Sequence, residues 1–261
     1  MIEKVKDIVR RASRLMVTEG FVVNSKAGFT DIVTSSDLAV QHYLVEELSA
    51  LLPGCGFFCE EEGLRDPDKE QVWIIDPIDG TANYSRGIDH CCISVALAIN
   101  GEMQLGVVYS PMRDECYHAV KSKGAFCNGI PIRCSGRSFE DSVLCSALCL
   151  YRKEHAKICS DVIMDTYMQC NDVRRFGAAA IEICFLACGR CELYFEMRLM
   201  PWDFAAGMLI LREAGGVISG LDGGTPDLGK AGIVVAANSS ANHEKLLGIV
   251  RRHIRTTPYE N

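Results

Sequence analysis

Apolar residues follow one another at two different spacings along the chain, which predicts a mixture of helices and strands. They recur at helical intervals in residues 3–17 and again in residues 38–52, where Ser36 or Asp37 is expected to cap the second helix. The continuous apolar run within residues 71–77 instead predicts a buried strand. The N-terminal third is therefore expected to hold two helices followed by a strand.

An antiparallel meander is predicted for residues 92–127. Three apolar runs follow one another there, and the pairs Asn100-Gly101 and Asn128-Gly129 favour tight turns. After the meander, strands are predicted at 143–150, 191–197 and 232–238, and helices at 153–168, 178–189, 202–216 and 240–254.

This interleaving of strands and helices, with antiparallel pairs in the middle, favours a layered α/β (α+β) fold with mixed sheets. The meander gives way to a new strand–helix series near residues 135–145. We expect an N-terminal subdomain, residues 1–140, and a C-terminal subdomain, residues 141–261.

Composition and charge exclude several classes of function. The chain has 261 residues, of which 48% are apolar and 23% charged, so it can bury a substantial core. A net charge of −7 argues against nucleic acid as the main partner, because no basic stripe is present to neutralise phosphates. No apolar run reaches the roughly 18 residues of a membrane span, and the N-terminus lacks the apolar core of a signal peptide. A cytoplasmic protein is expected.

Two motifs suggest cofactors that their surroundings do not support. The chain has 14 cysteines, and the spacing of Cys184, Cys188 and Cys191 resembles an iron–sulfur triad, but the first two lie in an apolar predicted helix. Cysteines in apolar runs pack as small hydrophobic side chains and are expected to stay reduced. Residues 223–230 have the spacing of a phosphate loop, but Ala231 and a strand follow where a hydroxyl residue and a helix are required.

The strongest chemical signal is a pair of acids at the end of a predicted strand. Asp76 and Asp79 follow the apolar run, and Gly80 permits a tight turn. If a helix begins at Thr81, the amides of Gly80 and Thr81 point outward and can bind an anion. Carboxylates beside exposed amides suit a metal ion that bridges to a phosphate.

Further acids lie near the ends of other predicted elements: Glu60–Glu62, Asp203, Asp31 and Asp37. Each has a structural alternative, because Asp203 can be a helix N-cap and the glutamate run a solvated turn. If they gather at one site, however, such carboxylates repel one another and raise one another's pKa. A hard cation such as Mg²⁺, which takes oxygen ligands and keeps several waters, removes that penalty.

Four segments of the chain resemble signature blocks of the inositol monophosphatase family. In chain order they are DIVTSSD (31–37), FFCEEEG (57–63), WIIDPIDGTANY (73–84) and PWDFAAGMLILREAGG (201–216), which is also the order of the family. The resemblance spans about residues 5–250. It implies a five-layered αβαβα sandwich of the sugar phosphatase type with mixed, largely antiparallel sheets, commonly a homodimer and often inhibited by Li⁺.

The same resemblance implies a magnesium centre of two to three ions. Glu60, Asp76 and the carbonyl of Ile78 match the ligands of the first ion. Asp76, Asp79 and Asp203 match those of the second, with Asp76 bridging the two. A third, weaker ion is implied at the Glu60 position.

Catalytic and phosphate-binding residues are implied in the same way. Thr81 and Asp37 match the pair that orients and deprotonates the attacking water, and Lys26 matches a loop lysine near the metals. The amides of Gly80 and Thr81, with Asp79, match contacts to the substrate phosphate.

Substrate recognition is where the chain departs from the family pattern. Glu196 matches the acid that binds substrate hydroxyls, and Ala179 lies on the matching sugar-side wall. The residues after Gly177 lack the hydroxyl often found there, and Arg198 adds a cation near Glu196 that could meet a second phosphate.

The predicted reaction is hydrolysis of a phosphate monoester by an activated water, with myo-inositol monophosphate as the expected substrate. Fructose-1,6-bisphosphatase, or another sugar or nucleotide phosphatase of the family, stays open. From a different class, a non-catalytic metal-binding interaction module also stays open. Thr81, Asp37 and Lys26 argue against that module, because metal binding alone needs none of them.

Overall fold

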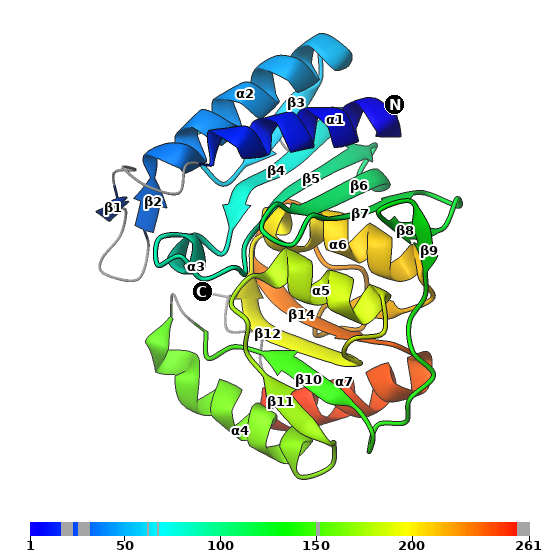
Figure 1. Ribbon diagram of the computed structural model, residues 1–261. Coiled ribbons are helices and arrows are strands. Elements are labelled where there is room, and N and C mark those ends of the chain that lie inside the picture. The colour runs from blue at the N-terminus through cyan, green and yellow to red at the C-terminus, as the bar shows by residue number, and fades with distance from the viewer. Residues whose placement is uncertain (17–22, 26–31, 62, 67, 150–151, 255–261) are drawn as a thin grey trace.

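The helices and strands of the chain stack in five layers, in the order αβαβα (Figure 1). This arrangement is seen in a computed structural model that describes residues 1–16, 23–25, 32–61, 63–66, 68–149 and 152–254. The predicted sandwich with mixed, largely antiparallel sheets is confirmed.

The first layer consists of two helices that cover the outer face of the larger sheet. Thr34, rather than the predicted Ser36 or Asp37, is the N-cap of the second helix, and its hydroxyl accepts from the amide of Asp37. Asp37 is the third residue of that helix and accepts in turn from the Thr34 amide. The elements of this part are α1 (Ile2–Ala12), η1 (Ser13–Leu15), β1 (Val23–Ser25), β2 (Ile32–Thr34) and α2 (Ser35–Leu51).

The larger sheet has seven strands in the order β3-β4-β5-β6-β7-β8-β9 and contains the predicted meander. Only β3 and β4 run parallel, and the other neighbours are antiparallel. Its strands, with the short helix that follows β4, are β3 (Gly56–Cys59), β4 (Gln71–Asp79), α3 (Thr81–Tyr84), β5 (Cys92–Ile99), β6 (Glu102–Ser110), β7 (Glu115–Val120), β8 (Ala125–Cys127) and β9 (Ile130–Ile132).

The middle layer holds α5 (Ala179–Ala187) and α6 (Pro201–Glu213), which are buried along most of their length. Both helices are apolar on nearly every face, as a helix between two sheets must be. Gly106 of β6 lets the sheet approach α6 closely, since a Cβ there would lie 2.8 Å from the carbonyl oxygen of Ala206. The position of α6 is therefore set by direct contact with the sheet.

The smaller sheet has the order β11-β10-β12-β14-β13, parallel around β10 and antiparallel around β14. The strand predicted at 143–150 is shorter than expected, because it pairs only as far as Ser146. Helices α4 and α7 cover the outer face. The elements are β10 (Val143–Ser146), η2 (Lys153–His155), α4 (Ala156–Tyr167), β11 (Asp172–Arg174), β12 (Leu193–Leu199), β13 (Val217–Ser219), β14 (Gly232–Ala237) and α7 (Ser240–His253).

The proposed division between residues 140 and 141 falls just before β10, the first strand of the smaller sheet. It stays a prediction, and the middle helices of the second half also pack against the larger sheet. All 14 cysteines are described and carry free thiols, those of Cys184 and Cys191 buried. Over the described residues, no helix combines the length and apolarity needed to cross a bilayer.

We predict that Gly106→Ala destabilises the protein by about 1–3 kcal/mol, because the added methyl group meets backbone atoms that cannot rotate away. Urea unfolding would measure the change in the free energy of unfolding. Gly232→Ala is the matched control, since a Cβ at this strand glycine meets nothing within 4 Å. A Gly106 variant as stable as that control would contradict the close approach of β6 and α6.

Candidate active site

A one-residue irregularity at the end of β4 places Asp76 and Asp79 on the same face of the sheet. Asp76 pairs with Ser94 and Asp79 pairs with Cys92, so an extra residue is inserted on β4. Without this bulge, two residues three apart would point to opposite faces of the strand. Both carboxylates therefore face the middle layer, where the Ser94 hydroxyl donates to the carbonyl of Trp202 at 3.1 Å.

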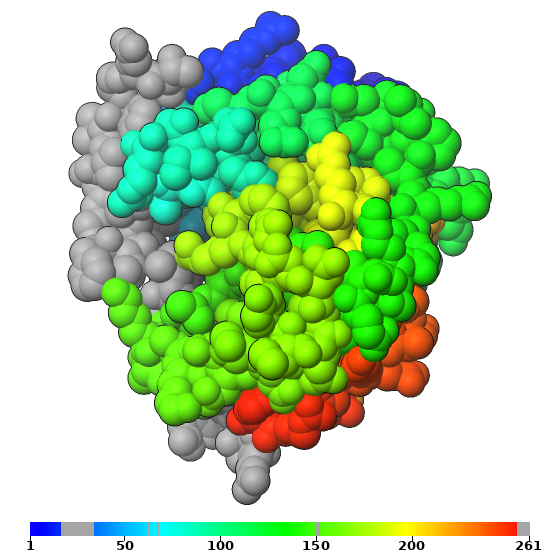
Figure 2. All heavy atoms as spheres, turned by 60° about the horizontal axis from the view of Figure 1, so that its bottom comes forward, coloured from blue at the N-terminus to red at the C-terminus, as the bar shows by residue number. Residues whose placement is uncertain are grey.

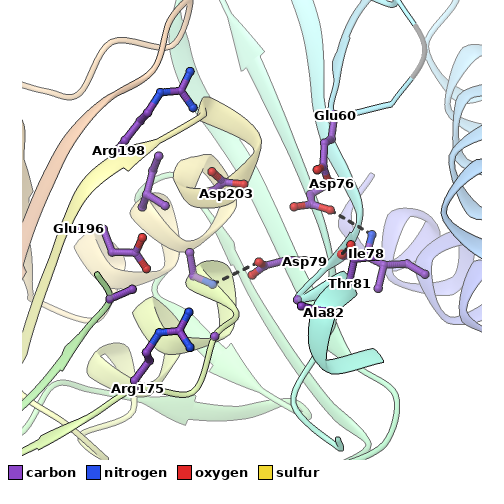
Figure 3. A pocket seen from close by; sticks show the side chains of 15 residues that line it. Glu60, Asp76, Ile78, Asp79, Thr81, Ala82, Arg175, Glu196, Arg198 and Asp203 are labelled. Carbon is purple, nitrogen blue, oxygen red and sulfur yellow. Dashed lines mark hydrogen bonds between the residues drawn. The ribbon is translucent and has the colours of Figure 1, made fainter. Parts of the chain in front are cut away.

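The two aspartates line one pocket with residues from distant parts of the chain (Figure 3). Glu60 follows β3, Asp203 lies in the first turn of α6, and Glu196 lies on β12. Every predicted metal or substrate residue lines this pocket. The complete lining is Glu60, Asp76, Ile78, Asp79, Gly80, Thr81, Ala82, Ala147, Arg175, Gly177, Ala179, Glu196, Arg198, Leu199 and Asp203.

The side chain of Asp79 connects the larger sheet to the N-terminus of α5. Its two carboxylate oxygens accept hydrogen bonds from the amides of Ala179 at 3.2 Å and Ala180 at 2.7 Å. The thiol of Cys92 lies 3.6 Å from the same carboxylate. A buried carboxylate is stabilised here by free amides and by the positive end of the helix dipole.

The turn after β4 requires a glycine at position 80. Gly80 has φ +88°, and a Cβ on it would lie 2.9 Å from the His90 carbonyl oxygen and 3.0 Å from the Ala178 Cβ. The turn thus packs tightly against the residues just before α5. In Figure 2 the cyan surface around α3 lies beside the yellow-green surface near residue 175.

Thr81 and Asp37 are in contact, as the predicted catalytic pair requires. The Thr81 hydroxyl lies 3.2 Å from Oδ1 of Asp37 and 2.9 Å from the carbonyl oxygen of Ile78. Asp37 is buried, and its Oδ2 accepts from both the amide and the hydroxyl of Thr34. Its remaining oxygen therefore faces Thr81. Lys26, the third predicted catalytic residue, lies outside the described residues.

Asp203 is not the N-cap of α6, which was the structural alternative. Met200 occupies the cap position and Pro201 is the first helical residue. Asp203 is the third, and its Oδ2 accepts from the Met200 amide at 2.7 Å. The other carboxylate oxygen remains available to the pocket, where Figure 3 shows Asp203 between Glu196 and Asp76.

Burial and mutual repulsion make the charged forms of these acids unfavourable. Burial raises the pKa of Asp76 well above its usual range, and the charges of Glu60 and Asp79 raise it further. Burial raises the pKa of Asp79 to about 6, although the two α5 amides act in the opposite direction. Burial and the charges of Asp79 and Glu60 also raise the pKa of Asp203.

This donor set fits a hard divalent cation, which takes carboxylate and carbonyl oxygens and offsets repulsion between acids. Within the described part of the chain, however, no three His, Cys, Asp or Glu side chains already surround a single point as metal ligands. The acids share a pocket without forming a closed coordination sphere.

Glu196 and Glu182 are two further acids near the pocket. Burial raises the pKa of Glu196 to about 8, and the charge of Glu182 contributes. The Tyr194 hydroxyl donates to Glu196 at 3.2 Å. Glu182 is buried in α5, and its Oε1 accepts from the amides of Phe176, Gly177 and Ala178. It thereby fixes the loop that precedes the two amides bound to Asp79.

Several lining residues were missed by the sequence reasoning, namely Ala82, Ala147, Arg175 and Leu199, and Gly177 was noted only as the residue before a missing hydroxyl. Gly177 has φ +88° and lies close to Asn83, whose side chain donates to the carbonyl of Phe176 at 2.7 Å. A glycine just before a helix was an available signal for that turn. Arg175 had no sequence signal that separates it from the adjacent Arg174.

Comparisons with known proteins agree with this geometry. A sequence profile described as the inositol monophosphatase family matches residues 1–255. The Nus factor SuhB of Escherichia coli strain K12 is 35% identical over 221 residues, which cover 82% of this chain and 83% of that protein. An inositol-1-monophosphatase of Mesorhizobium japonicum is 38% identical over 217 residues, covering 82% of this chain and 81% of that protein.

Solved structures show the same similarity. The Thermotoga maritima IMPase superposes with a TM-score of 0.88 and 29% identity, covering 97% of this chain and 98% of that one. The profile match, the two relatives and the shared fold all extend over most of the chain. The chain therefore belongs to the inositol monophosphatase family.

Proposed function

We propose that this protein is a Mg²⁺-dependent phosphomonoesterase that hydrolyses myo-inositol monophosphate to inositol and phosphate. One observation carries the proposal: Glu60, Asp76, Asp79 and Asp203 line a single pocket beside the Gly80–Thr81 turn. Acids with raised pKa values in a shared pocket are typical of functional sites. Membership of the inositol monophosphatase family supports the same activity.

The proposed ligands of the first ion are Glu60, Asp76 and the carbonyl of Ile78. Those of the second are Asp76, Asp79 and Asp203, and a third ion would attach through Glu60. Bound Mg²⁺ supplies a water of lowered pKa and positive charge for the phosphate oxygens. The amides of Ala179 and Ala180 bind the two carboxylate oxygens of Asp79 and so fix the orientation of this side chain.

The Thr81–Asp37 contact supports a role in activating the attacking water. A water beside Thr81 can give its proton to the Thr81 hydroxyl oxygen while that hydroxyl gives its own proton to Oδ1 of Asp37. Because Thr34 binds the other oxygen of Asp37, the acceptor is held in place. Lys26 keeps its proposed role near the metals.

The proposed substrate contacts fall into two groups, those to the phosphate and those to the inositol ring. The Gly80 and Thr81 amides would bind phosphate together with the Asp79 site, and Ala179 would form the wall beside the ring. Glu196 would accept hydrogen bonds from the inositol hydroxyls. An apolar ester would offer the buried Glu196 no such hydrogen bonds, so this contact favours a polyol over an apolar ester.

The name of one relative bears on the alternative of a non-catalytic interaction module. The Escherichia coli relative is named a Nus factor, and that name describes that protein. In this chain, the hydroxyl–carboxylate contact of Thr81 and Asp37 favours catalysis, because metal binding alone does not need it. Homodimer formation, Li⁺ inhibition and a cytoplasmic location stay predictions.

Asp79→Asn is expected to leave the fold nearly intact and to lower kcat on the order of 100-fold, because charge stabilisation at the phosphate is lost. Phosphate release from p-nitrophenyl phosphate with Mg²⁺, with and without Li⁺, gives the activity, and circular dichroism checks the fold. Asp89→Asn, at an exposed aspartate, is the matched control. Full activity of the Asp79 variant would refute the metal assignment.

Glu196→Ala is expected to raise KM for inositol 1-phosphate about 10-fold, since the hydrogen bonds between the Glu196 carboxyl group and the inositol hydroxyls are lost. The KM for p-nitrophenyl phosphate, which has no polyol hydroxyls, should change little. Steady-state kinetics on both substrates make the comparison within one variant. An equal rise in both KM values would mean that Glu196 does not contact the polyol.

The stability of the metal-free protein should fall as the pH rises. Because the pKa of Asp79 increases from its ordinary 3.8 to about 6 on folding, the folded chain retains a proton there that the unfolded chain releases. The stability linked to this proton is complete below the ordinary value and is lost as the pH passes through about 6.

Thermal unfolding in EDTA should accordingly give a lower Tm at about pH 7 than at about pH 5, and Mg²⁺ should raise Tm more at the higher pH. Asp79→Asn should weaken both trends. A Mg²⁺-induced shift in Tm that is the same at both pH values in the unsubstituted protein would be the contrary result.

A further inference from the structure

An arginine outside the pocket connects the segment after β3 to the first turn of α6. The guanidinium carbon of Arg65 lies 4.6 Å from the ring centre of Trp202 and 5.4 Å from that of Phe58. The two rings are buried and meet edge to face, with their centres 5.1 Å apart. Because Arg65 is exposed, its planar guanidinium covers these rings from the solvent side, an arrangement that cation–π attraction stabilises.

The same side chain holds the backbone of Glu60, one of the proposed metal ligands. Arg65 lies opposite Phe58 in a short antiparallel bridge beside β3. Its Nη2 donates to the carbonyl oxygen of Glu60 at 3.1 Å, and its Nη1 donates to the carbonyl oxygen of Leu64 at 3.1 Å. The amide of Glu60 donates in turn to the carbonyl oxygen of Ile75 at 3.1 Å. Glu60 is therefore held by its backbone on both sides.

These contacts join two proposed ligands that are far apart in the chain. Glu60 directly follows β3, Asp203 directly follows Trp202, and both line the pocket with Asp76. Figure 3 shows the side chains of Glu60 and Asp203 on different sides of Asp76. A guanidinium that binds the Glu60 carbonyl and rests on the Trp202 ring fixes the spacing of these acids from outside the pocket.

We propose that Arg65 is a positioning residue of the metal centre, which holds Glu60 against the start of α6 and thereby strengthens Mg²⁺ binding. This inference rests on the proposed function, because it takes Glu60 and Asp203 as ligands of the ions. Groups that orient metal ligands without touching the ion typically contribute about 10- to 100-fold to metal affinity. Arg65 acts in this way through a carbonyl group and an aromatic ring.

The positive charge of Arg65 has the opposite effect on Mg²⁺ binding. A cation beside Glu60 repels Mg²⁺, so the loss of this charge alone would strengthen metal binding. Because Arg65 is exposed, water and dissolved salt screen that repulsion. The loss of the contacts with Glu60 and Trp202 is therefore expected to outweigh the loss of the charge.

Two substitutions of Arg65 separate these effects. Arg65→Ala removes the contacts and the charge, whereas Arg65→Lys keeps the charge but has no planar group that can stack and donate at once. Isothermal titration calorimetry without substrate should give a Kd for Mg²⁺ about 10-fold higher in Arg65→Ala. The Kd should be at least about threefold higher in Arg65→Lys. At saturating Mg²⁺, the kcat for p-nitrophenyl phosphate should stay within about twofold, because Arg65 does not line the pocket.

Arg113→Ala is the matched control. Arg113 is also an exposed arginine over an aromatic ring, with its guanidinium carbon 5.8 Å from the ring centre of Phe185. It pairs with Glu115 at 3.4 Å, and neither Phe185 nor Glu115 lines the pocket. Its substitution should leave the Kd for Mg²⁺ unchanged. The Tm values of the metal-free variants separate a general loss of stability from a loss of metal affinity.

Three outcomes would overturn the inference. They are a Kd for Mg²⁺ that is unchanged or lower in Arg65→Ala, a rise in Arg65→Ala that Arg65→Lys does not share, and an equal rise in Arg113→Ala. Failure of the unsubstituted protein to bind Mg²⁺ or to hydrolyse any phosphate ester would instead refute the proposed function. The two failures are therefore distinguishable.

Discussion

The carboxylate of Asp79 is held between the two halves of the molecule, and the site depends on this contact. Its oxygens accept from the amides of Ala179 and Ala180, which lie 100 and 101 residues further along the chain. The bulge in β4 turns Asp79 toward these amides, and Glu182 fixes the loop that precedes them. This one interaction holds the end of β4 and the start of α5 together beside the pocket.

The same arrangement makes the pocket electrostatically unfavourable without a cation. Asp76 and Asp79 are buried, and their pKa values are raised by burial and, for Asp76, by neighbouring acids. Structural stability alone does not call for such a cluster, since replacing it with apolar residues would remove the repulsion. Acids retained in this form are consistent with a site whose stability and activity both depend on bound metal.

The proposed metal ligands and the proposed substrate contacts come from different parts of the fold. The acids that define the first come from β4, the end of β3 and the start of α6, whereas Glu196 and Arg198 lie on β12 and Arg175 directly follows β11. The smaller sheet can therefore change its pocket residues without disturbing the acidic end. Such a division allows one hydrolytic centre to serve different phosphate esters within a family.

The sequence by itself determined the order of elements and the chemistry of the site. The antiparallel meander of residues 92–127, the middle helices and the acids at strand ends follow from apolar periodicity and from residue type, which act locally. Tertiary structure alone decided the β4 bulge, the contact of Asp79 with α5 and the placement of Arg175 in the pocket. These features depend on strand register and on packing between segments about 100 residues apart, and no local pattern encodes either.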